Sequence, residues 1–458
     1  MSSRPHRCRL DLDQSAGWAS AIPRLALPST DTRLVSNGYR EGRAVIGYRE
    51  AVARLVDGAC RRGTQRVVLA DACGRVLADD AVGTHALPPF DNAAVDGVAL
   101  ASSGGTLRAG SEWDIAARIG AGEPAPRDAG IAWEIMTGAP LPAHADTIVP
   151  VECIEAVPSP GPGRARVRLL ADAWPEANIR RRGEDVRPGQ VLLRRGSVVD
   201  AARLMVLAGA GIDTVEVARR PRVTLVATGR EIVATGEPLP PGGIHDATSP
   251  YLAAVAAAAG ADLIRVVRVG DDVARFQRAL EAASADGADL VLSTGAVSKG
   301  VYDFVPAALA ARDAEPLFHG VAMRPGKPVL AARLREGAMF VGLPGNPLST
   351  AVGFRFLVEP LLRAWLGMAP EPERWLPLAS ACRKRAGLLA MFHGTLRGDD
   401  EGRLQACVAE AQASFRLLPF SQSSVWITLP TEPDHVDAGA RVQVHGSGHL
   451  HPPTWSVP

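Results

Sequence analysis

The sequence predicts a multidomain α/β protein built around a parallel β-sheet that helices cover on both faces. Short apolar runs alternate with helical patterns between residues 219 and 366, which is typical of consecutive βαβ units. Residues 98–178 and 367–458 contain short strand patterns broken by Gly and Pro, and predict an inserted β module and a small C-terminal β barrel or sandwich. A length of 458 residues agrees with several domains, because domains usually hold about 100–200 residues.

Composition and charge argue against several classes of protein. The formal net charge is +1, so no overall field favours nucleic acid or a membrane surface as a partner. The six cysteines lie far apart without a C-x-x-C pair, which argues against a zinc ribbon or a thioredoxin-type site. No secretory signal and no membrane-spanning apolar run is visible, so a cytoplasmic protein is predicted. Residues 1–40 are predicted to form a mostly disordered arm.

The first ordered elements are predicted from residue 47 onward. A helix begins there, because its apolar residues recur at helical spacing in one stripe. The remaining elements before residue 219 are short. We predict strands at 66–69, 75–77, 113–118, 132–136, 147–151, 166–169 and 214–217, a Thr-initiated turn at Thr137, and a helix at 201–208.

Two acids in this part of the chain have alternative interpretations. Asp96 stands beside Gly97 in a turn-forming segment, so it is either an acid of a polar turn or a carboxylate presented to a ligand. Composition alone favours the turn. Glu184 lies in a mixed-charge run at 179–185, which is either a solvated face or a carboxylate beside cations at a cleft.

Strands and helices alternate through the next stretch of the chain. Ser249-Pro250 and Asn346-Pro347 are predicted helix starts, each a capping residue followed by Pro. The first of these helices should end before Gly260 and the second near residue 365. We also predict strands at 223–227, 263–269, 290–293, 329–332 and 339–341, helices at 273–283 and 305–311, and C-terminal strands within 396–408, 425–429 and 442–444.

Three strand ends in the central region carry glycine-containing loops. The loops follow strands that end at Thr228-Gly229, at Thr294-Gly295 and before Pro344-Gly345-Asn346. Parallel strands end on the same side of a sheet, so these loops should lie together. Loops of this kind, next to helix N-termini, suit a phosphate-bearing or oxyanion ligand.

Charged residues near these loops extend the prediction. Arg324 and Lys327 stand in a loop stiffened by Pro and Gly, and are either surface cations or ligands of a small dianion such as phosphate, sulfate or molybdate. Acids among phosphate-binding loops favour a Mg²⁺ ion that bridges them to the ligand. No H-E-x-x-H, Walker A or nucleophile-elbow motif is present.

Six motifs, in one order along residues 45–366, resemble those of the molybdopterin molybdenumtransferase family, which includes the bacterial MoeA proteins and the gephyrin E domain. The motifs are PFDNAAVDG at 89–97, IMTGAPLP at 135–142 with ADTIV at 145–149, IRRRGEDV at 179–186, TGAVS at 294–298 with Asp303, MRPGKP at 323–328 and GLPGNPLS at 342–349. The C-terminal module matches the family only weakly.

The resemblance implies four domains and an elongated homodimer. Residues 41–86 with 180–218 would form a linking α/β domain, 87–179 an inserted β-rich lid, 219–366 a MogA-like, doubly wound, mostly parallel sheet domain that binds molybdopterin, and 367–458 a C-terminal β barrel. Both subunits would build the cleft. Asp96 and Glu184 would come from one chain, and Asp246, Gly295, Ser298 and Asp303 from the other.

The implied reaction inserts molybdate into adenylylated molybdopterin, with Mg²⁺-dependent release of AMP. Asp96, Glu184, Asp246 and Asp303 would be catalytic, and the last three would hold Mg²⁺. Molybdate would bind Arg324, Lys327 and Ser349. The pterin substrate would bind Thr137, Thr228, Gly229, Ser249, Thr294, Gly295, Val297, Ser298, Pro344, Gly345 and Asn346. Molybdopterin adenylyltransferase and recipient molybdoenzymes or their chaperones are candidate partners.

The chain departs from the family pattern at several positions. Ala296 replaces a Gly, which costs about 1 kcal/mol or more if the position needs a positive φ. Arg230 replaces an acid at the phosphate edge. No Arg lies in register near Phe392-His393-Gly394, and the Ser expected from the family falls near Leu418-Pro419; both family residues help bind molybdate.

These departures leave two alternatives to a working molybdenumtransferase. One is a diverged paralogue that carries molybdopterin or binds a partner protein as a scaffold, without efficient metal insertion. The other is an enzyme that delivers a modified cofactor or another oxyanion such as tungstate.

Overall fold

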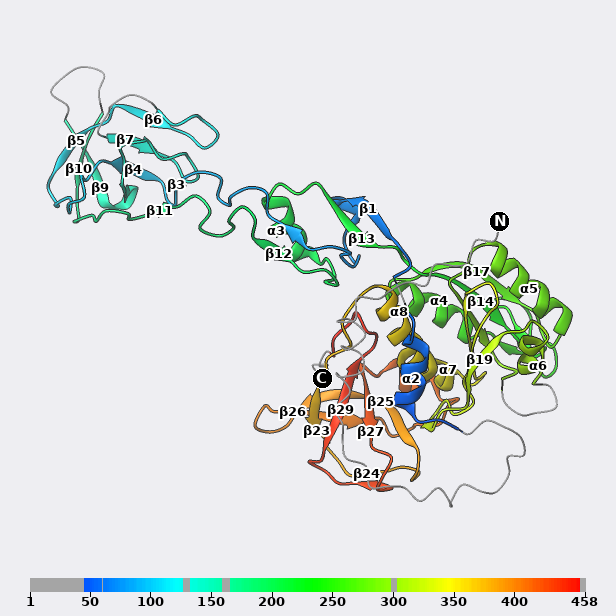
Figure 1. Ribbon diagram of the computed structural model, residues 1–458. Coiled ribbons are helices and arrows are strands. Elements are labelled where there is room, and N and C mark those ends of the chain that lie inside the picture. Colours follow the sequence, from blue (N-terminus) through cyan, green and yellow to red (C-terminus); the bar gives the residue numbers. More distant parts are fainter. Residues whose placement is uncertain (1–44, 60, 127–131, 159–164, 298–302, 454–458) are drawn as a thin grey trace, which may run out of the picture.

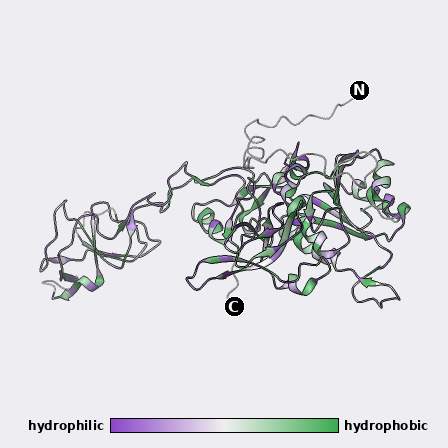
Figure 2. Ribbon diagram, turned by 90° about the horizontal axis from the view of Figure 1, so that it is seen from below, coloured by the Kyte–Doolittle hydropathy of each residue, from purple (hydrophilic) through white to green (hydrophobic). Residues whose placement is uncertain are grey.

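The computed structural model describes residues 45–59, 61–126, 132–158, 165–297 and 303–453. It divides into a large body and a small β-rich region, which an extended linking region joins (Figure 1). The separation persists in the view turned by 90° (Figure 2). The predicted N-terminal arm lies outside the described residues. None of the helices in the described ranges is both long enough and apolar enough to cross a bilayer.

The body contains a six-stranded sheet in the order β17-β14-β18-β22-β21-β19. The first four strands are parallel to one another, as predicted. Strand β21 pairs antiparallel with β22, and β19 pairs antiparallel with β21, so the mostly parallel sheet is mixed at this edge. The tight turn between β21 and β22 explains the difference, because a parallel pair needs a long crossover connection. The strands are β14 (Arg222–Ala227), β17 (Asp262–Arg268), β18 (Leu290–Thr294), β19 (Glu315–His319), β21 (Leu330–Arg333) and β22 (Met339–Leu343).

Helices cover both faces of this sheet, as the sequence predicts. Alternate residues of a strand point to opposite faces. Leu225 packs in one core with residues of α4 (Thr248–Ala258) and α7 (Pro347–Gly353). Its neighbour Val226 packs in a second core with α5 (Val273–Ala285) and α6 (Val305–Ala310). The central strands β14, β18 and β22 are therefore buried on both faces, whereas the edge strands β17 and β19 are partly exposed.

The helix starts differ from the prediction in their capping chemistry. Helix α4 begins at Thr248, and the Asp246 carboxylate accepts from the backbone N–H groups of Thr248 (3.2 Å) and Ser249 (2.9 Å). The predicted Ser249 cap is therefore wrong. A carboxylate two residues before the helix reaches its free N–H groups better than a hydroxyl already inside the first turn. Helix α7 does begin at Pro347, but the side chain of Asn346 makes no capping hydrogen bond.

The predicted helix from residue 347 to 365 is interrupted. A π-helical turn, Phe354–Val358, joins α7 to α8 (Glu359–Trp365). Pro360 lacks an N–H and cannot donate to the carbonyl four residues earlier, which explains a local change in the hydrogen-bond ladder.

The linking region consists of two chain segments that run side by side. One leaves the body and the other returns, and short antiparallel pairs hold them together. The predicted strand at 75–77 is replaced by isolated bridges from Val76 to Val198 and from Leu77 to Val217. The elements are β1 (Thr64–Val68), η1 (Leu69–Asp71), β2 (Ala81–Val82), β12 (Val191–Leu193), α3 (Ala201–Gly209) and β13 (Thr214–Ala218). At the far end of the link, β3 (Asn92–Ala93) pairs with β11 (Ile179–Arg180), and both pack in the core of the β-rich region (Figure 1).

The β-rich region at the end of this link contains two small sheets. Their strand orders are β5-β10-β9 and β6-β7-β4-β8. The predicted strand at 113–118 is split between them, so its two halves belong to different sheets. The elements are β4 (Gly97–Leu100), β5 (Glu112–Asp114), β6 (Ala117–Ile119), β7 (Ala132–Ile135), β8 (Thr147–Pro150), η2 (Val151–Cys153), β9 (Ile154–Val157) and β10 (Arg166–Leu169).

The C-terminal module is β-rich and packs against the body. Its main sheet has the order β20-β25-β27-β29-β23, with β26 paired to β25. Strand β20 (Met323–Arg324) belongs to the loop that carries the predicted cations, so this sheet fixes that loop. The other elements are β23 (Trp375–Pro377), β24 (Cys382–Arg383), β25 (Leu389–Gly398), β26 (Leu404–Val408), α9 (Leu417–Ser421), β27 (Val425–Leu429), β28 (His435–Val436) and β29 (Arg441–Gly446).

A buried charge cluster joins the C-terminal module to the helices of the body. The Arg355 guanidinium lies 3.2 Å from a Glu359 oxygen and donates two 2.8 Å hydrogen bonds to Glu371. The backbone N–H of His449 donates to Glu359 at 2.8 Å. Arg355, Glu371 and His449 line a cavity, and Tyr48 of helix α2 (Tyr48–Val56) lines it as well. Burial raises the pKa of Glu359 to about 8, although Arg355 and the His449 N–H oppose the shift.

We predict that Glu359 makes stability fall as pH rises between about 5 and 8. The folded state holds its proton more tightly than the unfolded chain, so deprotonation favours unfolding with a slope of up to about 1.4 kcal/mol per pH unit. In Glu359→Gln, the free energy of unfolding should therefore rise relative to the wild type as pH increases over this window. Urea unfolding at several pH values checks this, with the exposed Glu401→Gln as a control for charge loss. Parallel pH profiles of wild type and Glu359→Gln would refute the assignment.

Candidate functional site

The three predicted loops meet at one edge of the central sheet. In the strand register Ala227 pairs with Thr294, and Thr294 pairs with Leu343, so β14, β18 and β22 end at the same level. The loops are also bonded to one another. Thr228 donates its N–H (3.0 Å) and its hydroxyl (2.7 Å) to the Thr294 carbonyl, and the Gly295 N–H donates to the Leu343 carbonyl at 2.9 Å. The predicted convergence of these loops is confirmed.

The turn after β18 uses a backbone conformation that favours glycine. Gly295 has φ +82°, and a Cβ there would lie 2.7 Å from the Thr228 hydroxyl. Ala296 also has a positive φ, +52°. The cost expected at Ala296 depended on a positive φ at this position, and the structure shows one. A left-handed conformation brings Cβ close to the backbone carbonyl, at a cost of about 1 kcal/mol or more for a non-glycine residue.

We predict that Ala296→Gly stabilises the protein by about 1 kcal/mol, because Gly adopts this φ without steric cost. Ala254→Gly, at an exposed position inside α4, is the matched control and should destabilise by a similar amount. Urea unfolding, followed through the transition of the central sheet, measures both. Destabilisation by both substitutions would contradict the assigned strain.

The other predicted pterin-binding residues near this edge have mixed surroundings. The side chain of Val297 is buried in the core, and its carbonyl accepts from His319 Nε2 at 2.7 Å. The carbonyl of Pro344 accepts from the Thr350 hydroxyl at 2.6 Å. Ser298 lies outside the described residues. The edge therefore offers mainly backbone groups to a ligand.

Asp246 lies at this edge, and both oxygens of its carboxylate accept hydrogen bonds. One oxygen caps α4 and also contacts the Thr248 hydroxyl at 3.2 Å, while the other accepts from Arg268 Nε at 3.0 Å. Burial alone would raise the pKa of Asp246, but hydrogen bonds from Ser249 and Arg268 hold the pKa below its usual value. The group is a structural anion that orders the start of the helix.

Two further acids stand close to the loops. Glu231 was not among the residues predicted from the sequence. Its carboxylate lies 2.8 Å from the position that a Cβ on Gly229 would take. Asp303 lies two residues before α6, and the first N–H of that helix, from Val305, donates to the Ala296 carbonyl at 3.4 Å. Asp303 is thus held near the strained turn.

These acids do not form a ready Mg²⁺ site within one chain. No group of three or more His, Cys, Asp or Glu side chains has a metal-binding arrangement in the described ranges. Asp246 accepts three hydrogen bonds at Oδ1 and one, from Arg268, at Oδ2, so the lone pair that remains on Oδ2 lies beside a guanidinium that repels a cation. Glu184, the third predicted ligand, follows β11 and precedes β12, two elements that lie away from the body (Figure 1).

A cationic pocket lies beside this edge. Its volume is about 650 Å³, and the predicted residues Arg324, Lys327 and Ser349 all line it. Ser349 belongs to the first turn of α7, so the helix that starts at the sheet edge also reaches the pocket. The C-terminal module supplies the opposite wall with Arg383, Lys384, Arg385, Gln412 and Ser414. Among the residues that the structure describes, no acidic side chain lines it.

Sequence reasoning missed this second wall. The alignment to the family pattern put the position of the family's molybdate-binding Ser near Leu418-Pro419, whereas in the structure Ser414 lines the pocket. The run Arg383-Lys384-Arg385 was a visible signal. Its significance depends on a pairing between distant strands, because β20 aligns beside β25 and brings the two cationic segments together.

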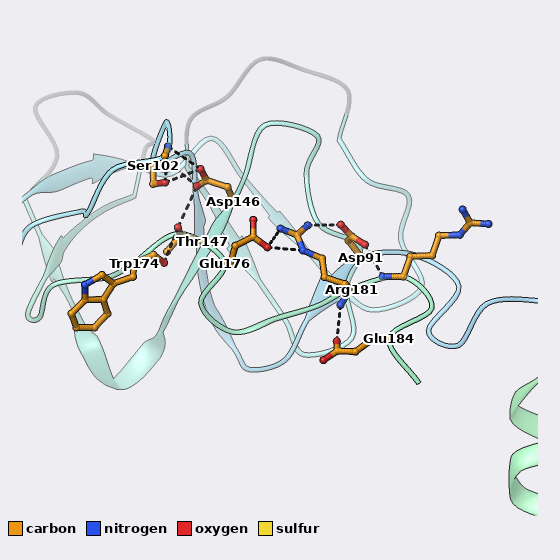
Figure 3. Close-up of polar contacts among 10 residues, drawn as sticks. Asp91, Ser102, Asp146, Thr147, Trp174, Glu176, Arg181 and Glu184 are labelled. Carbon is orange, nitrogen blue, oxygen red and sulfur yellow. Dashed lines mark hydrogen bonds and ion pairs between the residues drawn. The ribbon is translucent and has the colours of Figure 1, made fainter. Parts of the chain in front are cut away.

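The remaining predicted residues gather in the small β-rich region and its link. Asp96 accepts from both the N–H and the hydroxyl of Thr137 at 2.7 Å, and these bonds lower the pKa of Asp96. Asp96 is thus presented beside Thr137, as an ionised carboxylate. Glu184 accepts from the Arg181 N–H at 3.0 Å, and Arg181 bridges Asp91 and Glu176 (Figure 3).

A second polar network stiffens the same region. Asp146 accepts from the N–H and the hydroxyl of Ser102, both at 2.7 Å, and Thr147 donates to the Trp174 carbonyl (Figure 3). Each network ties together strands or loops that are distant in sequence. The region therefore holds Asp96 in a fixed setting, although a single chain keeps it apart from the sheet edge (Figures 1 and 2).

The fold defines an α/β protein with glycine-containing loops at one sheet edge and a cationic pocket beside it, and comparison with known proteins agrees. Residues 46–211 match the model of the MoeA N-terminal region (domain I and II), and residues 224–364 match a probable molybdopterin binding domain. A molybdopterin molybdenumtransferase of Synechococcus elongatus is 36% identical over 412 residues, covering 87% of this chain and 99% of the relative. The Bacillus subtilis molybdopterin molybdenumtransferase is 31% identical, covering 88% and 94%.

A solved structure shows the same architecture. The molybdopterin biosynthesis MoeA protein from Pyrococcus horikoshii superposes with a TM-score of 0.72 at 25% identity, covering 88% of this chain and 99% of that one. The chain belongs to the MoeA family of molybdopterin molybdenumtransferases. The family resemblance noted in the sequence is confirmed.

Proposed function

We propose that this chain inserts molybdate into adenylylated molybdopterin and releases AMP, as the last chemical step of molybdenum cofactor synthesis. The observation that carries the proposal is the acid-free cationic pocket, which directly adjoins a glycine-rich sheet edge. Backbone donors at such an edge suit the phosphates of the pterin substrate. The pocket suits a tetrahedral dianion, since cations and hydroxyls donate to all sides of it.

Each part of the chain then has a separate task. The loops after β14, β18 and β22 bind and orient the phosphate-bearing substrate, while Arg324, Lys327 and Ser349 hold molybdate beside it. Water attacks a phosphorus of the phosphoanhydride, and AMP leaves. The two thiol groups of the dithiolene then give their protons to one oxygen of molybdate, which leaves as water while both sulfurs bind the molybdenum. Binding both reactants in one cleft accelerates the exchange by fixing their orientation.

Mg²⁺ belongs to the reaction that the family resemblance implies, but the acids of one chain do not fit a Mg²⁺ site. Asp246 would have to release Arg268 before it could bind a cation. The steps above are therefore assigned to side chains and backbone groups alone.

We further propose that the working unit is a homodimer. In one chain, β4 and β11, which stand next to Asp96 and close to Glu184 in the sequence, lie far from β14, β18 and β22, so a second copy would present these acids at the sheet edge (Figure 1). Each cleft would combine the β-rich region of one subunit with the body of the other. Molybdopterin adenylyltransferase and recipient molybdoenzymes or their chaperones are the partners that such a reaction requires.

One observation favours the alternative of a carrier or scaffold. His393 is buried with its Nδ1 2.8 Å from the Ser423 hydroxyl, and a Cβ on Gly394 would lie 2.1 Å from the Cys407 carbonyl. Neither position could direct a cation toward the pocket. If no other residue compensates, molybdate binding would be weak while pterin binding persists.

We predict that Lys327→Ala lowers the yield of active cofactor at limiting molybdate by about tenfold or more, because a charged hydrogen bond is worth about 1.5–3 kcal/mol. Purified protein, adenylylated molybdopterin, Mg²⁺ and molybdate are mixed, and AMP and active cofactor are measured together. Asp303→Asn should impair AMP release in the same assay.

The exposed Arg397→Ala, on the far end of β25, controls for loss of a positive charge. Wild-type protein that binds the pterin but yields neither product would reject the enzyme and favour the carrier. AMP without active cofactor would separate a working pterin edge from a defective oxyanion pocket.

A further inference from the structure

The pocket described above carries more positive charge than its predicted residues supply. Arg324 and Lys327 come from the loop before β21, while Arg383, Lys384 and Arg385 come from a segment about sixty residues further along the chain. Five cationic residues, and no acidic residue of the described part of the chain, thus line this one pocket. In a chain whose positive and negative charges nearly balance, such a concentration is unfavourable unless an anion binds there.

The three C-terminal cations are not equivalent. The Lys384 ammonium donates to the Thr431 carbonyl at 2.7 Å, and burial lowers its pKa. Its role is to fix the segment. Arg383 and Arg385 are exposed and form no ion pair with any carboxylate in the described ranges. Their guanidinium groups are therefore available to a ligand.

The backbone holds these arginines in place. Arg383 lies in β24 and pairs with His435 of β28, and the N–H of Lys384 donates to the Asp434 carbonyl at 2.8 Å. On the other side of the pocket, the Leu348 N–H in α7 donates to the Ser414 carbonyl at 3.1 Å, which joins the two walls. The pocket is thus a built feature of the contact between the sheet domain and the C-terminal module.

We propose that Arg383 and Arg385 bind the oxyanion substrate, and so supply from β24 and the loop after it the positive charge that His393 and Gly394 cannot. The inference rests on the proposed function and extends it to residues outside the predicted molybdate set. A guanidinium donates two parallel hydrogen bonds to adjacent oxygens, which suits a tetrahedral dianion held between two walls. The ligand chemistry is that of a tetrahedral oxyanion, and we assign it to free molybdate rather than to a phosphate of the pterin.

The test measures equilibrium binding of molybdate to the purified full-length protein by calorimetry at fixed ionic strength. Arg383→Gln and Arg385→Gln should each weaken molybdate binding about tenfold, and the double variant more. Arg397→Gln removes the same charge from an exposed end of the same module and should change the affinity less than twofold. Inorganic phosphate, titrated in parallel, is the second arm.

The outcomes separate this inference from the proposed function. If the wild type binds molybdate and both arginine variants match Arg397→Gln, the inference is wrong and the function stands. If the arginine variants lose phosphate binding but keep molybdate binding, the arginines serve the pterin phosphate and the inference is again wrong. If the wild type itself binds no molybdate, the proposed function fails together with the inference. Retained circular dichroism and unfolding midpoints show that a loss reflects the pocket rather than misfolding.

Discussion

The site depends on the register of three neighbouring parallel strands. Because β14, β18 and β22 are aligned so that Ala227, Thr294 and Leu343 lie in one row, their loops emerge together at one edge. Both faces of these strands are buried, and a slip by one residue would exchange the two cores. The hydrophobic packing of the sheet thereby fixes the positions of the backbone N–H groups in the loops after β14, β18 and β22.

The pocket extends this edge by joining two parts of the chain. The first turn of α7 carries Ser349 from the sheet edge into the hollow, and the pairing of β20 with β25 brings the C-terminal cations opposite Arg324 and Lys327. The buried contact of Arg355 with Glu359 and Glu371 stabilises the same domain junction from elsewhere. Loosening this junction would separate the pocket walls without changing any residue that lines them.

The sequence allowed the central fold and most of the loops to be predicted, since both depend on local patterns. Apolar runs gave the buried strands, and Gly and Pro marked the loops, so Thr228, Gly295 and Gly345 were found correctly at one edge. Strand β21 was predicted without its antiparallel direction, because the hydrophobic pattern of a strand does not show its direction, and β19 was not predicted at all. The cap at Asp246 was missed because it depends on where the first turn begins. Arg383 and Arg385 required knowledge of which distant strands pair.

In the proposed dimer, a complete cleft combines the β-rich region of one subunit with the body of another. Asp96→Asn and Lys327→Ala lie in the two halves, so each variant alone should retain no more than about a tenth of wild-type activity at limiting molybdate. When equal amounts are unfolded and refolded together, half of the dimers should be mixed, and each should contain one intact cleft. The account predicts about a quarter of wild-type cofactor synthesis in this mixture. No recovery, despite mixed dimers shown by mass spectrometry, would place all these residues in a cleft within one chain and contradict the account.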